Sequence, residues 1–338
     1  MTFLKRLRVL PVVLGVAATL TALGTSLFGD VRPGAAPAPS GDRPDGGRVV
    51  EDLVLTKFSK LPALTYQPRD GELLFAWQVK PTVEAGPARP RDVLVVVDAS
   101  ASQAGRPLQQ ARQVLSGLTE ALGAGDRVSV WVASTPAATR PLTKGFLAAR
   151  ADEVREAAVA LTEVEYGSGA TDLKNALSKA LATIAPARGR QQVVLLLGDG
   201  DSAFNPVTED ERLALGTRMD NADVGFFAVP LGVKVNPQNL HGLAAQTGGA
   251  VVRVQEDLAN PTKRGEFVSR LVAAIDTPVV KVDKFKFGAE VGEVYPTKLP
   301  PLRADRTTLV MGKMARPAEA VTLAVNGFVA GRPVALNL

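Results

Sequence analysis

Two unbroken hydrophobic stretches lie in the middle of the chain, and each ends at a carboxylate. Residues 92–98 have the sequence DVLVVVD, and residues 192–199 have the sequence QVVLLLGD. Short apolar runs of this kind are typical of strands that are buried on both faces of a parallel sheet. Further strands are predicted at 127–133, 224–229 and 250–254, with a weaker one at 139–146.

Between these strands, apolar positions recur at the spacing of a helix. In the segment 105–122, leucine or alanine recurs every three or four residues, and glycines follow directly. Other helices are predicted at 151–162, 172–184, 209–220, 237–246 and 257–275. Because strands alternate with helices, we expect residues 91–276 to form an α/β domain with a doubly wound, mostly parallel sheet covered by helices on both faces.

The pattern changes on both sides of this domain. Residues 73–79 alternate between apolar and polar positions in the part of the chain before it. After Pro278, short apolar runs are separated by proline and glycine, which is typical of antiparallel strands. We therefore expect a β segment over 49–90 and a β-rich flanking module over 277–338.

The first residues predict export. Lys5, Arg6 and Arg8 precede Val9–Phe28, an uncharged stretch of about 20 residues that is long enough to span a bilayer. We predict a signal or membrane anchor over 1–29 and a linker rich in Pro, Gly and Ala over 30–48. The sequence leaves open whether this segment is an uncleaved membrane anchor or a signal peptide that is cleaved near residues 36–38. In either case, the folded part is expected on the periplasmic or extracellular side.

Composition excludes several classes of site. The chain has no cysteine and one histidine, His241, so disulfides, thiolate metal sites and two-histidine metal motifs are excluded. The net charge is +5 and aromatic residues make up 5%, with no basic run beyond residues 5–8, so we expect no nucleic-acid partner. Since no Gly-rich phosphate loop with Lys-Ser/Thr is found, we do not expect an enzyme.

A carboxylate and two hydroxyls follow the first buried strand directly. Asp98, Ser100 and Ser102 alternate along the expected turn and can face one point. Thr171 opens a predicted helix after a glycine-rich loop, and Asp199 ends the second buried strand. Both strand ends belong to the edge where open α/β sheets bind ligands. Hard oxygen ligands suit Mg²⁺, although each residue taken singly is also an ordinary cap or turn residue.

The three elements, in this order, resemble a von Willebrand factor A domain with a metal-ion-dependent adhesion site. The family pattern is Asp-x-Ser-x-Ser, a Gly-rich loop with Thr-Asp, and an apolar strand ending in Asp-Gly. Two positions depart from it, Ala170 and Gly198, without removing a ligating oxygen. We place two further carboxylates, Asp172 and Asp201, outside the ligand set. The resemblance implies that Mg²⁺, or Mn²⁺ or Ca²⁺, is bound by Asp98, Ser100, Ser102, Thr171 and Asp199.

The flanks add a second resemblance. Residues 294–302 (VYPTKLPPL) and 308–313 (TLVMGK) resemble a segment of inter-alpha-trypsin inhibitor heavy chains and their bacterial relatives. In that family, chain on both sides of the A domain builds a β-sandwich, which implies that the A domain is inserted between its strands.

The function implied by the two resemblances is binding of a protein partner through a Mg²⁺-bridged acidic residue. A metal-stabilised scaffold and a module that binds a surface polysaccharide stay open as alternatives, and a Mg²⁺-dependent hydrolase is the least favoured.

Overall fold

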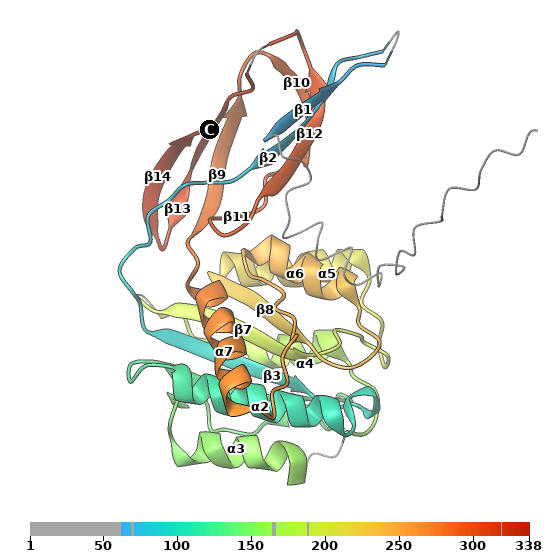
Figure 1. Ribbon diagram of the computed structural model, residues 1–338. Coiled ribbons are helices and arrows are strands. Elements are labelled where there is room, and N and C mark those ends of the chain that lie inside the picture. The colour runs from blue at the N-terminus through green and yellow to red at the C-terminus, as the bar shows by residue number, and fades with distance from the viewer. Residues whose placement is uncertain (1–61, 69–70, 164–166, 188, 319) are drawn as a thin grey trace, which may run out of the picture. The chain divides into compact units, whose positions relative to one another are not determined.

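The computed structural model describes residues 62–68, 71–163, 167–187, 189–318 and 320–338 (Figure 1). The predicted signal or anchor, the predicted linker and the first part of the predicted β segment lie outside these residues. None of the helices in the described ranges is long and apolar enough to cross a membrane. Export and anchoring of the chain therefore stay predictions from the sequence.

A central sheet of six strands has the order β5-β4-β3-β7-β8, with β6 also paired to β4. The strands β3, β4, β7 and β8 are parallel, whereas β5 and β6 run antiparallel to β4. Their bounds are Arg91–Asp98 for β3, Arg127–Ala133 for β4, Arg140–Pro141 for β5, Leu147–Ala148 for β6, Gln191–Gly198 for β7 and Val224–Pro230 for β8. The predicted α/β fold with a mostly parallel sheet is confirmed.

The prediction of a strand at 250–254 was wrong, because only Val251 forms a bridge, to Ala228 of β8. The predicted weak strand at 139–146 is replaced by the two-residue strands β5 and β6.

Helices cover both faces of this sheet, as Figure 1 shows. Side chains of α2, α3 and α7 share one core cluster with Val93, Val95 and Val97 of β3. Side chains of α4, α5 and α6 share the other cluster with Leu94 and Val96. Since successive strand residues point to opposite faces, β3 needs an apolar residue at every interior position. The bounds are Arg106–Ala121 for α2, Asp152–Glu163 for α3, Leu173–Leu181 for α4, Glu209–Asn221 for α5, Pro237–Thr247 for α6 and Pro261–Asp276 for α7.

Two antiparallel sheets of four strands each form the flanking module, with the orders β1-β2-β12-β10 and β11-β9-β13-β14. The bounds are Ala63–Tyr66 for β1, Leu74–Val79 for β2, Val279–Phe287 for β9, Val291–Tyr295 for β10, Leu302–Arg303 for β11, Thr308–Met314 for β12, Leu323–Val329 for β13 and Arg332–Asn337 for β14. Both sheets contribute to one core, for example Phe75 from the first and Val325 from the second. Because β2 pairs with β12, chain before and after the α/β domain joins in one sheet, as the second resemblance implies.

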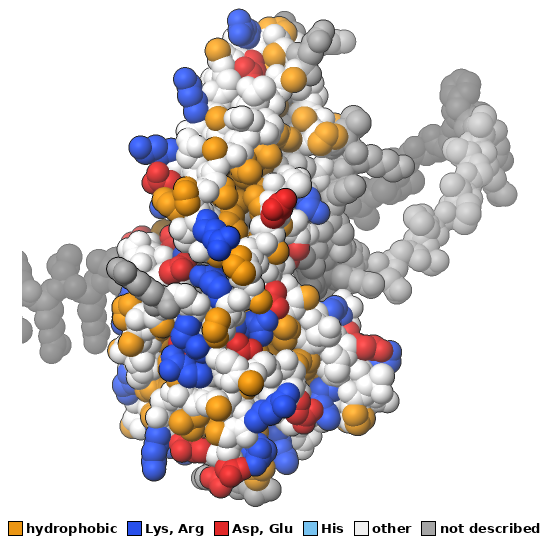
Figure 2. Space-filling view, turned by 90° about the vertical axis from the view of Figure 1, so that its left-hand side faces the viewer, with side chains coloured by type: hydrophobic (Ala, Val, Ile, Leu, Met, Phe, Trp, Pro, Cys, Tyr) orange, Lys and Arg blue, Asp and Glu red, His pale blue; other side chains and the backbone are white. Residues whose placement is uncertain are grey.

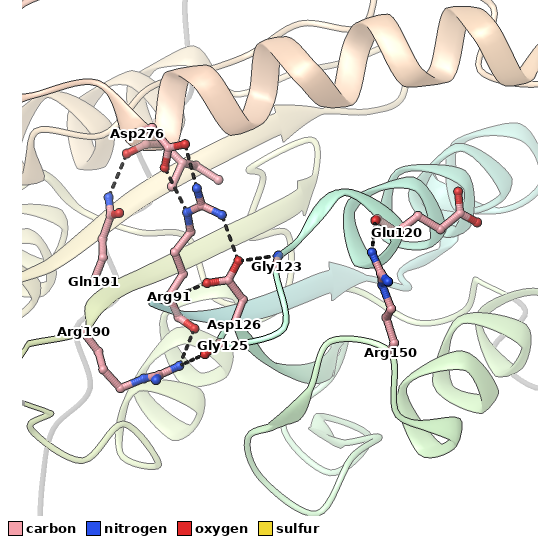
Figure 3. A network of polar contacts seen from close by, with 10 residues as sticks. Arg91, Glu120, Gly123, Gly125, Asp126, Arg150, Arg190, Gln191 and Asp276 are labelled. Atoms are coloured by element: carbon pink, nitrogen blue, oxygen red, sulfur yellow. Dashed lines mark hydrogen bonds and ion pairs between the residues drawn. The ribbon is translucent and has the colours of Figure 1, made fainter. Parts of the chain in front are cut away.

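Ion pairs join the amino ends of the central strands (Figure 3). Arg91 at the start of β3 contacts Asp126 at 2.9 Å and Asp276, the last residue of α7, at 2.7 Å. Asp92 is 2% exposed and contacts both Arg127 and Arg190 at 2.7 Å. Burial raises the pKa of the Asp92 carboxyl, but the hydrogen bonds from these guanidinium groups outweigh it and lower that pKa. The amino edge of the sheet is therefore stabilised by ion pairs between carboxylates and guanidinium groups.

Candidate metal centre

The carboxyl edge of the central sheet brings Asp98 and Asp199 together. Asp98 is the last residue of β3, and Asp199 follows β7 directly. The two strands are adjacent and parallel, with Val97 opposite Leu197, so their ends meet. Both carboxylates are 3% exposed. The structure thus places two carboxylates, well separated in the sequence, beside each other at a buried site.

Three hydroxyls connect to these carboxylates. Thr171 Oγ1 donates to Asp98 Oδ1 at 2.6 Å, and Ser102 Oγ donates to Asp199 Oδ2 at 2.6 Å. Ser100 Oγ and Ser102 Oγ are 3.1 Å apart. Ser100 also donates its backbone N–H to Asp98 Oδ1 at 2.9 Å. All five residues singled out in the sequence therefore belong to one hydrogen-bonded group, in which Ser102 is the exposed member.

The glycine-rich loop is fixed to the turn after β3 by its backbone. Ala101 N donates to Gly169 O at 3.0 Å, and Ser168 N donates to Ala99 O at 2.8 Å. Gly169 has a φ of +73°, a conformation that glycine adopts without steric cost. Asp172 accepts a hydrogen bond from Asn175 N at 3.0 Å and caps α4. This arrangement holds Thr171 beside Asp98 and leaves the Asp172 carboxylate occupied with the helix terminus.

Gly198, one of the two departures from the family pattern, has a steric reason. A Cβ atom at position 198 would lie 2.5 Å from Asp98 Cβ, a separation that real Cβ atoms essentially never show. The absence of a side chain allows β3 and β7 to place their terminal carboxylates close together. Ala170, the other departure, is half-buried, and nothing in the structure explains it.

Gln103 is a residue of the site that the sequence pattern does not mark. Its side chain is buried, and Nε2 donates to Asp199 Oδ2 at 2.8 Å and to Ser102 Oγ at 3.3 Å. The amide therefore orients the Asp199 carboxylate through Oδ2. Its position directly after Ser102 is the one available signal, but a polar residue before a helix is ordinarily exposed.

The electrostatics of the site favour a cation. Burial, helped by the charge of Asp199, raises the pKa of Asp98 from 3.8 to about 6, against the hydrogen bonds from Thr171 and Ser100. Among the described residues, no ion pair with Lys, Arg or His is found for either carboxylate. The described ranges contain no group of three or more His, Cys, Asp or Glu residues that could hold a metal ion, so any ion at this site depends on the hydroxyls as well as on the two carboxylates. Two carboxylates and three hydroxyls, all hard oxygen donors, fit Mg²⁺, which binds few protein charges and keeps waters.

A cavity among the described residues lies away from this site. It has a volume of about 510 Å³ and is lined at the amino ends of the central strands by Arg91, Gln191 and Asp276, among others. Figure 2 looks onto this side of the molecule, where basic and acidic side chains are interspersed. The cavity therefore does not mark the place where the carboxylates and hydroxyls converge.

The fold agrees with comparisons to known proteins. Residues 91–252 match the model of the von Willebrand factor type A domain. Over these residues the chain is similar to von Willebrand factor type A domains, and we refer to its α/β domain as the A domain. A structure described as "von Willebrand factor type A from Catenulispora acidiphila" superposes with a TM-score of 0.51 at 14% identity, covering 82% of this chain and 68% of that chain. This likeness shows the fold.

Two curated relatives bear out the second resemblance. Inter-alpha-trypsin inhibitor heavy chain H4 of Homo sapiens is 25% identical over 253 residues, covering 70% of this chain and 26% of that protein. Inter-alpha-trypsin inhibitor heavy chain H4 of Sus scrofa is 24% identical over 217 residues, covering 62% of this chain and 23% of that protein. This chain thus spans about a quarter of the length of these relatives. Von Willebrand factor type A domains commonly bind a divalent metal ion, and they generally bind protein partners.

Proposed function

We propose that this A domain binds one divalent metal ion and, through it, an acidic residue of a protein partner. The single observation that supports this most is the pair of buried carboxylates, for which the described residues offer no cationic side chain. The two carboxylates belong to one hydrogen-bonded group with three hydroxyls, of which one is exposed. The ligand set proposed is Asp98, Ser100, Ser102, Thr171 and Asp199, and Mg²⁺ is the ion it suits best.

The residues of the chain have distinct parts in this proposal. Asp98 and Asp199 supply negative charge that is already desolvated, so a bound ion meets little competition from water at these oxygens. Gln103 is a positioning residue, because its amide holds Asp199 Oδ2. The ion, when bound, supplies an electrophilic coordination position. Because Ser102 is exposed, that position is reached from solvent at the carboxyl edge of the sheet.

Binding is favoured over catalysis by the neighbours of these five residues. Among the described residues, the hydrogen-bond partners of the five side chains are one another, backbone amides and the Gln103 amide. A hydrolase or phosphoryl transferase needs a general base beside the reacting atoms. Within the part of the chain that the structure describes, no histidine or lysine contacts the group, which supports a binding module.

The setting proposed for this module rests on the sequence. The uncharged stretch Val9–Phe28 after a basic start supports export and anchoring in a membrane, and segment 30–48 supports a tether. A module held at a membrane surface in this way would present its carboxyl edge to partners outside the cytoplasm.

The experiment is calorimetric titration of Mg²⁺, Mn²⁺ and Ca²⁺ into the full chain in detergent, beside Asp199→Asn. We expect one ion per wild-type chain and a loss of most of the affinity in the variant. The matched control is Asp201→Asn, which removes a half-buried carboxylate on the same loop that is outside the proposed ligand set. Absence of metal binding by the wild type would overturn the proposal, and binding without any metal-dependent partner would favour a metal-stabilised scaffold.

A further inference from the structure

We infer that the partner of this site is a polypeptide segment in which the coordinating Asp or Glu is flanked by large apolar side chains, received by Phe204 and Val233. The inference rests on the proposed function and adds the class of sequence that the partner presents. It depends on two loops that border the metal ligands and hold exposed apolar side chains.

Phe204 borders the site on the side of Thr171. It lies in the β7–α5 loop and is 55% exposed, a large value for an aromatic side chain. Its backbone N–H donates to Thr171 O at 3.1 Å. The loop around it is held firmly, because Ser202 Oγ donates to Asn205 O at 2.7 Å and accepts from Leu173 N at 3.0 Å. The backbone of Phe204 is thus one hydrogen bond away from a proposed ligand, and its side chain is exposed.

Val233 borders the site on the side of Asp199. It lies in the β8–α6 loop and is fully exposed, at 105%. The loop is tied down at both ends, since Leu231 N donates to Gly198 O at 3.2 Å and Asn236 N donates to Asp199 O at 2.8 Å. The side chain of Gln103 also donates to Leu231 O at 3.4 Å. The loop that carries the exposed Val233 is therefore hydrogen-bonded to Gly198, Asp199 and Gln103.

Single exposed apolar residues are common on protein surfaces, so exposure alone does not indicate a binding site. Leu213 on α5 and Phe328 on β13 are also exposed, at 46% and 45%, although neither element contributes a proposed ligand. Phe204 and Val233 differ because the loops that carry them make backbone hydrogen bonds to Thr171, Gly198 and Asp199. An apolar group next to a charged coordination site adds affinity only for a partner with an apolar group next to its carboxylate.

This chemistry favours a polypeptide over an acidic polysaccharide. A polyuronate presents carboxylates surrounded by hydroxyls, and a fully exposed valine offers them no hydrogen bond. A peptide with leucine, phenylalanine or methionine beside its Asp would bury that side chain against Phe204 or Val233. Burial of such surface predicts a gain of about tenfold to a hundredfold in affinity over the same peptide with alanine in those places.

The test uses a displayed library of nonapeptides with a central Asp, selected on the full chain in detergent with Mg²⁺ and again with chelator. We expect Mg²⁺-dependent enrichment of large apolar residues beside the Asp. Phe204→Ala and Val233→Ala should each weaken binding of a selected peptide by about tenfold or more while Mg²⁺ affinity stays unchanged. Matched controls are Phe328→Ala and Leu213→Ala, which remove exposed apolar side chains elsewhere.

The outcomes separate this inference from the proposed function. Enrichment that depends on Mg²⁺ but shows no apolar preference, or that is unaffected by the two variants, would overturn the inference and leave the proposed function standing. Mg²⁺-dependent binding of soluble polygalacturonate that survives Phe204→Ala and Val233→Ala would overturn it in favour of a polysaccharide. Ion binding without any Mg²⁺-dependent peptide would overturn both.

Discussion

Replacement of Asp98 by Asn tests the site through the stability of the domain without metal. Asp98 is 3% exposed, and its pKa rises from 3.8 to about 6 on folding, chiefly through burial. At about 1.4 kcal/mol per pKa unit, keeping this carboxylate ionised at pH 8 costs the folded state about 3 kcal/mol. Asn has nearly the same shape, and its carbonyl oxygen can accept the hydrogen bonds from Ser100 N and Thr171 Oγ1. In chelator at pH 8, Asp98→Asn is therefore expected to be about 2–3 kcal/mol more stable than the wild type.

The difference in stability between Asp98→Asn and the wild type should depend on pH with a defined sign. The folded state binds a proton on Asp98 more tightly than the unfolded state does, so the wild type in chelator loses stability as the pH rises from about 4 through about 6. Below pH 4 both states are protonated at this position, and the stability of the wild type should approach that of Asp98→Asn. With Mg²⁺ at pH 8, the wild type should gain stability and the variant should not, because the ion needs the ionised carboxylate.

The assay is urea unfolding followed by tryptophan fluorescence at pH 4.5 and pH 8, in chelator and in Mg²⁺. The chain has two tryptophans, and Trp131 on β4 reports on the A domain when Trp77 of the flanking module is replaced by Phe. A variant less stable than the wild type in chelator at pH 8 would refute the reasoning that the buried charge is destabilising. If Mg²⁺ still stabilises Asp98→Asn, Asp98 is not a ligand of the ion.

Three further predictions follow from other buried groups. Gln103→Leu, which leaves Asp199 without its amide donor, should lower Mg²⁺ affinity about tenfold or more with little change in fold, as measured by calorimetry and circular dichroism. Asp92→Asn should cost about 3–5 kcal/mol at pH 7 by urea unfolding. Because the pKa of Asp92 is lowered, this difference should shrink as the pH falls below about 4; a constant difference would contradict the charge argument. His241, whose pKa is lowered to about 4 by burial and by Arg253 and Arg306, should stay neutral at pH 5.5 by NMR, and its replacement by Gln should reduce the stability lost between pH 6.5 and pH 4.

Much of the fold and the candidate site could be predicted from local patterns. The run 92–98 is apolar at every interior position because both faces of β3 are covered, and this marks it as a central strand. Asp98 and Asp199 each end such a run, so parallel pairing alone brings them together.

The features that the sequence does not reveal depend on contacts between distant segments. Gln103 is buried only because Asp199 and Leu231 offer partners, and the close approach of Gly198 to Asp98 exists only in the folded sheet. Phe204 and Val233 are apolar like core residues, and the pattern does not show that they are exposed. By contrast, α7 begins at Pro261 rather than at 257 for a local reason, since Asn260 caps it through Thr262 N and Lys263 N.

The insertion of the A domain between β2 and β9 has a mechanical consequence. The chain leaves β2, enters β3 at Arg91 and reaches Asp98 within a single strand. If a partner pulls on an ion held at Asp98 while the preceding chain is held at a membrane, the load runs along β3. This strand is hydrogen-bonded along its length to β4 on one side and β7 on the other, both parallel to it. Extraction of β3 would require both ladders to shear at once, so the domain is expected to resist tension in the direction in which a tethered adhesive contact would apply it.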